Sequence, residues 1–156
     1  NISKLSMMLT LAELYELYEA AEDDNKSSIV KEAVDVIVTA IGGWMHAKGE
    51  ISRNLNLILI KAMCDLLESM DVDPRKALAA VNRSNFSKLI LDSESEAASD
   101  YFAHQYITVY IKSLGDGLMG CYSSHDQTVG EKFYDADKLL KSHKYMAIDE
   151  SKEFWL

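Results

Sequence analysis

The sequence predicts an all-α protein, a bundle of four or five helices with a small C-terminal β-hairpin appendage. Residues that favour helices dominate the first half of the chain, and the whole chain contains one proline. Capping signals recur at the starts of the apolar segments. The composition changes near residue 106, where β-branched and aromatic residues begin. Because 156 residues suit one domain, we expect a single domain with a helical bundle over 1–105 and a hairpin and extension over 106–156.

Five segments combine helix-favouring residues with start or stop signals. They are residues 3–21, about 29–47, about 52–70, about 74–82 and about 94–105. Ser27 or Ser28 is expected to cap the second helix after a polar loop. Asp73-Pro74 predicts the start of the fourth, because Asp suits the N-cap and Pro the first turn. Ser93-x-x-Glu96 has the spacing of a capping box and predicts the start of the fifth.

Two β-rich segments follow the helices and predict a hairpin. Residues 106–114 and 118–124 flank Gly115-Asp116-Gly117, which is typical of a tight turn between strands. Another short strand is expected near 132–134. The rest of the C-terminal region is predicted to be loop.

Composition limits the classes of partner. The net charge is −9 and the pI is about 4.8, so a nucleic-acid polymer is not an expected partner. A small polyanion could still bind if metal ions bridge it to the protein. Asp35, Lys61 and Asp65 interrupt the most apolar stretches, so no membrane partner is expected. Cys64 and Cys121 form no zinc-type cluster, which favours a reducing, cytoplasmic compartment.

Two pairs of acidic residues stand out, Glu13-x-x-Glu16 and Glu32-x-x-Asp35. Residues three apart share one face of a helix, and both pairs lie in mostly apolar helices, where unpaired carboxylates are costly to bury. Neither acidic stripe contains Lys or Arg. If the two helices pack antiparallel, four carboxylates can face each other and hold Mg²⁺, or Mn²⁺ in its place. The alternative is that both stripes simply face solvent.

These pairs belong to a longer ordered set of motifs. Fifteen residues separate Glu16 from Glu32, and the set consists of ELYEA at 16–20, EAVDVIVTAIGG at 32–43, SNFSK at the end of 70–89, and Lys138-Leu-Leu-Lys141-Ser142 followed by Tyr145. In this order the set resembles the MazG-like all-α nucleoside triphosphate pyrophosphohydrolases, which include phosphoribosyl-ATP pyrophosphohydrolase and the dimeric dUTPases. The resemblance covers most of the chain. It is weak between Gly43 and Asp73.

The resemblance implies a Mg²⁺-dependent hydrolase that converts (d)NTP to (d)NMP and pyrophosphate in nucleotide-pool control. Glu13, Glu16, Glu32 and Asp35 would hold the metal and act in catalysis. Narrower alternatives are a dUTP or dCTP diphosphatase and a phosphoribosyl-ATP-type enzyme. Ala12 stands where several relatives carry a second glutamate, so a catalytically silent helical module that binds nucleotide or a partner is the alternative from another class. The C-terminal element is similar to that of phage and bacterial relatives, so we expect the cytoplasm of a bacterium or a phage-infected host.

Five further residues are candidates for substrate binding. Asn85 offers a donor and an acceptor for sugar or base edges, and Lys88 offers a charge for phosphate. Without the resemblance, Asn85 could equally cap a helix end and Lys88 could be solvated. Lys141 and Tyr145 come from the C-terminal element, and Arg83 could also meet phosphate.

Assembly is the last expectation from the sequence. The helix at 29–47 is apolar on almost every side, and the remaining helices of one small chain cannot cover it. We therefore expect a homodimer or homotetramer. The family resemblance also implies assembly, and pairing could bring Asn85 or Lys88 of one chain towards the carboxylates of the other.

Overall fold

The computed structural model describes residues 2–148 and Phe154. The chain is mostly helical with small antiparallel sheets near its C-terminal end, which agrees with a helical bundle followed by a β element. It divides into two compact units between Val81 and Asn82, and Phe154 belongs to the first unit. The boundary between the two units therefore lies more than twenty residues before position 105, where the sequence analysis places the end of the helical bundle.

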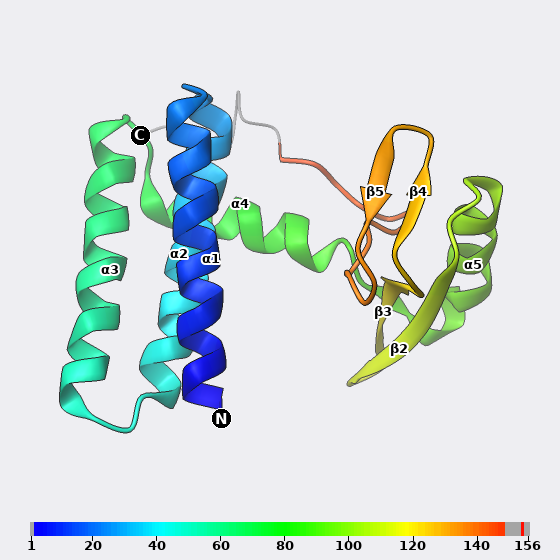
Figure 1. Cartoon of the computed structure of the whole chain (residues 1–156), viewed down its shortest axis with the longest axis horizontal. Coiled ribbons are helices and arrows are strands. Elements are labelled where there is room, and N and C mark those ends of the chain that lie inside the picture. The colour runs from blue at the N-terminus through cyan, green and yellow to red at the C-terminus, as the bar shows by residue number, and fades with distance from the viewer. Residues whose placement is uncertain (1, 149–153, 155–156) are drawn as a thin grey trace. The chain divides into compact units, whose positions relative to one another are not determined.

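The first unit contains three long helices and the start of a fourth. These are α1 (Ile2–Glu22), α2 (Lys26–His46), α3 (Glu50–Ser69) and α4 (Pro74–Phe86), as Figure 1 shows. Their positions agree with the predicted segments, although α4 ends four residues later than expected. Its start is as predicted, because Asp73 Oδ1 accepts a hydrogen bond from the Arg75 backbone nitrogen at 2.9 Å.

Asn25 caps α2, and the predicted cap at Ser27 or Ser28 is wrong. The Asn25 side chain accepts a hydrogen bond from the Ser28 backbone nitrogen at 3.1 Å. Asn serves as well as Ser at this position, because its side-chain oxygen satisfies a backbone donor that the first turn leaves free. The helix therefore begins three residues earlier than the sequence predicts.

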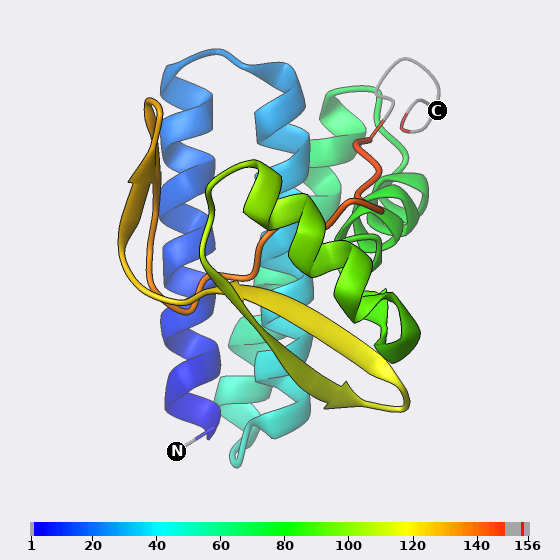
Figure 2. The ribbon, with the colours of Figure 1, turned by 90° about the vertical axis from the view of Figure 1, so that its right-hand side faces the viewer.

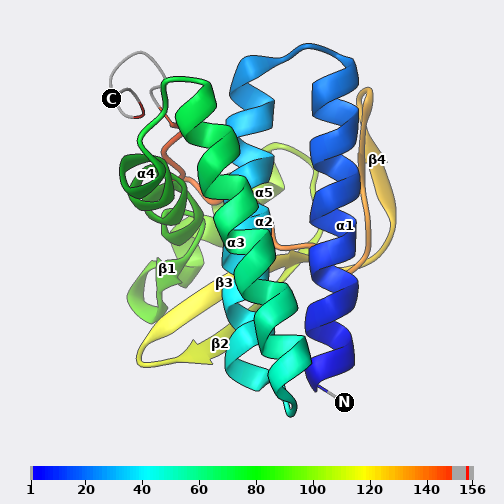
Figure 3. The same cartoon turned by 90° about the vertical axis from the view of Figure 1, so that its left-hand side faces the viewer.

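Among the described residues, helix α2 contributes more buried positions to the first unit than any other helix. It packs against both α1 and α3, and the three helices run alongside one another (Figures 1 and 3). Its buried apolar residues occur on several sides of the helix, as its sequence predicts; they are Val30, Ala33, Val34, Val36, Ile37 and Ala40. Burial of this helix fixes the position of the acidic residues that it carries.

Close packing of α2 against α3 depends on Gly43. A Cβ added at Gly43 would lie 2.5 Å from Asn56 Oδ1 of α3, whereas a Cβ at the adjacent Gly42 would meet nothing within 4 Å. Asn56 is held in place, because its side-chain nitrogen donates to the Ser52 carbonyl oxygen at 2.8 Å. Packing therefore requires a small residue at Gly43 but not at Gly42.

This difference gives a matched pair of substitutions. Gly42→Ala should stabilise the protein by about 0.5–1 kcal/mol, because alanine is the better helix former. Gly43→Ala should instead destabilise it by about 1–3 kcal/mol, the usual cost of overpacking. Urea unfolding of both variants measures the difference, and adding Asn56→Ala should restore the stability of Gly43→Ala. Equal stabilisation by both alanines would show that Gly43 is not a packing site.

The second unit combines α5 (Ser95–His104) with a three-stranded antiparallel sheet of order β1-β3-β2. The strands are β1 (Ile90–Leu91), β2 (Val109–Gly115) and β3 (Leu118–Ser123), and Figure 2 shows α5 lying over the twisted β2–β3 pair. The hairpin turn is the predicted one, with Asp116 and Gly117 at φ of 52° and 76°. The fifth helix thus packs on this sheet and lies outside the unit formed by the first helices.

Three local details of the second unit differ from the predictions. A short 3₁₀ turn, η1 (Asp92–Glu94), precedes α5, and Glu94 Oε2 accepts from the Leu91 backbone nitrogen at 2.7 Å in place of the expected Ser93 capping box. The expected strand near 132–134 is present as β5 (Lys132–Tyr134). It pairs with β4 (Gln127–Val129), which the sequence does not predict.

A small core holds the second unit together. Its buried members come from the sheet, from α5 and from the loops around them; they are Ile90, Ala98, Phe102, Ile107, Cys121 and Leu140. Leu140 lies beyond the last strand and is fixed by a hydrogen bond from its backbone nitrogen to the Cys121 carbonyl oxygen at 2.8 Å. The C-terminal extension therefore belongs to this unit at least as far as Leu140.

Apolar side chains remain exposed on the long helices of the first unit. Leu11, Leu55 and Ile58 are 57%, 58% and 63% exposed, and they line a groove of about 580 Å³ between α1 and α3. A second groove of about 650 Å³ includes Leu17 and Leu66 of the same two helices. Among the described residues, no helix combines the length and the apolar character needed to cross a membrane.

Candidate functional site

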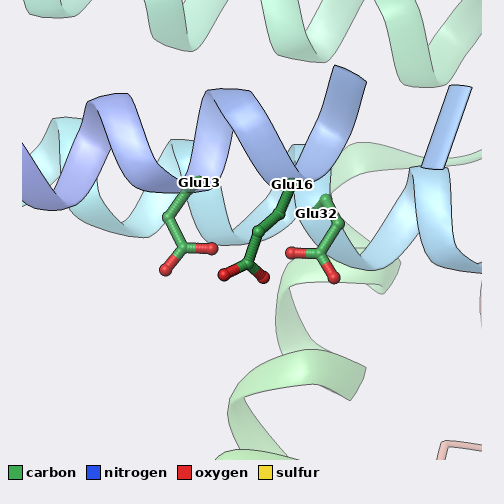
Figure 4. Close-up of side chains that lie close together, drawn as sticks. All are labelled: Glu13, Glu16 and Glu32. Atoms are coloured by element: carbon green, nitrogen blue, oxygen red, sulfur yellow. The ribbon is translucent and has the colours of Figure 1, made fainter. Parts of the chain in front are cut away.

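Three of the four predicted carboxylates converge in the first unit. Glu13 and Glu16 lie on one face of α1, and Glu32 reaches them from α2 (Figure 4). One carboxylate oxygen from each residue lies within 4.8 Å of the other two. The i,i+3 spacing on α1 and the packing of α1 against α2 are enough to bring these groups together.

Glu32 is the most unusual member of this cluster, because only 9% of the residue is exposed. Its Oε1 atom accepts a hydrogen bond from Lys31 Nζ at 2.8 Å. Its Oε2 atom is buried and has no hydrogen-bond partner among the described residues. A buried carboxylate oxygen without a partner costs free energy, so this atom is suited to a cation.

Lys31 is a functional neighbour that the sequence interpretation missed. Its ammonium group donates to Glu32 Oε1 and, at 3.0 Å, to Asp35 Oδ2. Neither acidic stripe contains Lys or Arg, but the Lys31 side chain reaches the stripe of α2 from an adjacent position. The signal was available, because Lys31 precedes Asp35 by four residues and such pairs meet on a helix.

Asp35 lies outside the group of three within 4.8 Å, but its charge acts on that group. Burial raises the pKa of Glu13 from 4.5 to about 7, with further contributions from the charges of Asp35, Glu16 and Glu32. Burial also raises the pKa of Glu32, against the opposing effect of Lys31. The carboxylates thus repel one another, and the crowding favours either a proton or a cation at the site.

Lys31 responds to the same crowding. Burial opposes its charge, but hydrogen bonds and charges from Glu32 and Asp35 outweigh that effect and raise the pKa of Lys31 above its usual range. The ammonium group therefore stays charged at neutral pH and neutralises part of the acidic cluster. About half of its side chain is exposed, at 48%, so it has room to move away.

The raised pKa of Glu13 gives a prediction for the metal-free protein. An acid whose pKa is higher in the folded than in the unfolded state stabilises the fold below pH about 4.5, and this stabilisation is lost as the pH rises through about 7. The stability of the wild type relative to Glu13→Gln should therefore fall between about pH 5 and pH 8. Denaturant unfolding in EDTA measures this difference, and a difference that stays constant across the range would contradict the assignment.

The donor set fits a hard divalent cation. Mg²⁺ prefers carboxylate oxygens and is commonly bound through a few carboxylates together with substrate phosphates. Glu13, Glu16 and Glu32 supply such oxygens within 4.8 Å of one another, and Glu32 adds an oxygen without a partner. These three residues would hold the ion, with Asp35 beside them on α2.

All five predicted substrate-binding residues belong to the second unit, and four of them form two contacting pairs. Lys88 Nζ donates to Asn85 Oδ1 at 2.8 Å, and the Lys141 ammonium group lies 4.6 Å from the centre of the Tyr145 ring. The hydroxyl of Ser84, the residue before Asn85, donates to the Tyr145 hydroxyl at 3.4 Å. Arg83 lies exposed in the last turn of α4.

Hydrogen bonds between distant segments build this basic cluster. The Met146 backbone nitrogen donates to Ser87 Oγ at 2.8 Å, and the Ser142 hydroxyl donates to the Ser87 carbonyl oxygen at 3.4 Å. The hydrogen bond from Ser84 and the charges of Lys141 and Lys88 lower the pKa of Tyr145, against the effect of burial. The sequence interpretation missed Ser84 and Ser87, whose roles depend on contacts more than fifty residues apart.

Comparison of the chain with protein-family models, with curated proteins and with solved structures finds no match. The geometry of the two clusters therefore carries the functional argument. The carboxylates belong to the first unit and the basic cluster to the second.

Proposed function

We propose that this protein is a Mg²⁺-dependent nucleoside triphosphate pyrophosphohydrolase with a MazG-like helical bundle. It would convert (d)NTP to (d)NMP and pyrophosphate. The observation that carries the proposal is the group of Glu13, Glu16 and Glu32, which includes one buried carboxylate oxygen without a hydrogen-bond partner. Such a group suits a divalent ion, and a divalent ion explains how an acidic chain could use an anionic substrate.

Each residue of the cluster has a part in this proposal. The bound Mg²⁺ would neutralise the substrate phosphates and lower the pKa of the attacking water. Glu13 and Glu16 present their carboxylates from one face of α1, and Glu32 presents its own from the buried side of α2. Lys31 holds Asp35 and Glu32 in place, and its charge limits the repulsion among the acidic groups.

The basic cluster of the second unit offers groups of the kinds that bind nucleotides. Lys88 and Lys141 offer positive charges for phosphate, and Arg83 offers a third from α4. The Asn85 amide and the Tyr145 hydroxyl can form hydrogen bonds with sugar or base edges. A general (d)NTPase and a dUTP- or dCTP-specific diphosphatase would use the same groups.

Pyrophosphate release tests the proposal. The purified chain should release pyrophosphate and a nucleoside monophosphate from at least one member of a panel of NTPs and dNTPs when Mg²⁺ is present. A matched reaction in EDTA should release none. Phosphoribosyl-ATP belongs in the panel, because the resemblance includes that activity. Absence of turnover with every substrate and with Mg²⁺ or Mn²⁺ would show that the chain is not such an enzyme.

The second candidate function is a catalytically silent nucleotide- or partner-binding module. The ion pairs of Lys31 with Glu32 and Asp35 favour it, because they neutralise part of the charge of the acidic cluster without a metal. Calorimetry with Mg²⁺ separates the candidates. A silent module should bind no Mg²⁺ at millimolar concentration in the wild type and should bind it in Lys31→Ala, where the carboxylates lose their partner.

A further inference from the structure

The second unit contains a pocket of about 320 Å³ that the carboxylate site does not use. Its base includes Phe102 and Leu140, which belong to the core of the unit. Three aromatic rings, those of Tyr101, Phe133 and Tyr134, also line it, and Phe133 is 55% exposed. A volume in this range accommodates a small organic ligand, and aromatic rings offer flat surfaces for a planar group.

Four lysines line the same pocket, namely Lys88, Lys132, Lys138 and Lys141. The chain contains seven Lys and Arg between residues 82 and 148, so more than half of the basic residues of this unit gather at one place. No acidic residue is among the described residues that line it. This concentration of positive charge is unexpected in a chain with a net charge of −9.

The charges of three of these lysines, Lys132, Lys138 and Lys141, are available to a ligand. Within the described part of the chain, Lys132, Lys138 and Lys141 form no ion pair with a carboxylate. Two of them lie over aromatic rings: Lys132 Nζ is 5.1 Å from the Tyr134 ring centre, and Lys141 Nζ is 4.6 Å from that of Tyr145. Contacts of this kind hold an ammonium group near a ring while leaving its donors accessible.

We propose that this pocket binds a nucleoside polyphosphate directly, without a metal ion. The lysines hold the phosphates, and the rings of Tyr101, Phe133 and Tyr134 hold the base. The two chemical features required for a nucleotide, several cations and a flat apolar surface, occur here within one small pocket. A single-stranded nucleic acid has the same features, but the small pocket and the acidic chain favour a single nucleotide.

The proposal goes beyond the pyrophosphohydrolase function and does not rest on it. Lys88 and Lys141 are shared with the proposed substrate contacts, whereas Lys132, Lys138 and the three aromatic rings are not. Binding in the absence of metal is the distinguishing property, because Lys31, the cation at the carboxylate cluster, is already paired with Glu32 and Asp35.

Calorimetry in EDTA tests the proposal with three probes: ATP, adenosine and tripolyphosphate. ATP should bind more tightly than either fragment, because each fragment uses only one half of the pocket. Lys132→Ala/Lys138→Ala should weaken ATP binding by at least about tenfold. Lys112→Ala should leave it unchanged, since Lys112 is an exposed lysine of β2 that does not line the pocket.

A second variant tests the aromatic part of the pocket. Phe133→Ala should weaken ATP binding by at least about fivefold and leave tripolyphosphate binding unchanged. Phe133 is largely exposed, so its removal should not unfold the unit. Glu32→Gln should bind ATP as the wild type does in EDTA, even if it has lost all turnover.

Four results would overturn the proposal. They are the absence of ATP binding in EDTA, equal weakening by Lys112→Ala, tripolyphosphate binding as tight as that of ATP, and binding of an oligothymidylate at least tenfold tighter than that of ATP. If the wild type shows no turnover but these binding results hold, the pyrophosphohydrolase function fails and the pocket stands. If the wild type turns over substrate but does not bind ATP in EDTA, the pyrophosphohydrolase function holds and the pocket proposal fails.

Discussion

Glu32→Gln should abolish Mg²⁺-dependent pyrophosphate release. The substitution keeps the size of the side chain and removes the charge from the only member of the cluster that has a buried oxygen without a partner. Mutating even the outer partners of metal ligands costs about 10- to 100-fold, so loss of a direct ligand should lower turnover by more than about 100-fold. A coupled pyrophosphate assay at saturating substrate and millimolar Mg²⁺ measures the effect.

Glu22→Gln is the matched control for this experiment. Glu22 is an exposed residue at the C-terminal end of α1, outside the group of three carboxylates, so its loss should leave turnover within about twofold of the wild type. Full activity of Glu32→Gln would remove Glu32 from the site. An equal loss in both variants would point to the overall charge of the protein in place of a specific ligand.

The same variants should differ in their response to metal. A ligand that binds only the folded state raises the melting temperature, and divalent ions also relieve repulsion among crowded carboxylates. Millimolar Mg²⁺ or Mn²⁺ should therefore raise the melting temperature of the wild type and of Glu22→Gln. Neither Glu32→Gln nor Asp35→Asn should respond as strongly, and NaCl of matched ionic strength should not replace the divalent ion.

Local sequence patterns predicted three members of the acidic cluster, although Asp35, the fourth expected member, lies outside the group. The i,i+3 spacing places Glu13 and Glu16 on one face, and the apolar surroundings of Glu32 predict its burial. Lys31 was missed because it lies beside the acidic stripe and not on it. A long, flexible side chain can reach a stripe from a neighbouring position, so face assignments made from Cβ directions underestimate such contacts.

The sequence predicted the fold well where the structure depends on residues close together in the chain. The helix at Pro74 and the hairpin at Asp116-Gly117 follow from backbone preferences of a few residues. The assignment of α5 was different, because an amphipathic segment of ten residues does not specify whether its apolar side meets helices or a sheet. Ala98 and Phe102 pack with Ile107 and Cys121, and only the tertiary structure shows this.

The cluster around Tyr145 illustrates the same limit over a longer distance. The sequence interpretation named Asn85, Lys88, Lys141 and Tyr145 from two separate motifs, and the structure connects these motifs through Ser84 and Ser87. Hydrogen bonds across more than fifty residues have no local signal in one sequence.

The exposed apolar groove between α1 and α3 predicts that the protein forms oligomers in solution. Leu11, Leu55 and Ile58 are more than half exposed and line the groove between α1 and α3, although each is large and apolar. Exposed apolar surface of this kind is common at subunit interfaces and uncommon on monomers. We expect the purified chain to sediment at micromolar concentration as a dimer or tetramer, and not as a species of 17.5 kDa.

Leu55→Glu/Ile58→Glu should convert that assembly to monomers. Both side chains are exposed in the single chain, so the substitution should remove the interface without removing core packing, and circular dichroism should show unchanged helix content. Asn54→Glu is the control, because Asn54 is an exposed neighbour on α3 that does not line the groove. It adds the same kind of charge to the same helix and should sediment as the wild type does. A monodisperse, active wild-type species near 17.5 kDa would show that one chain is sufficient, and the apolar groove between α1 and α3 would then need another explanation.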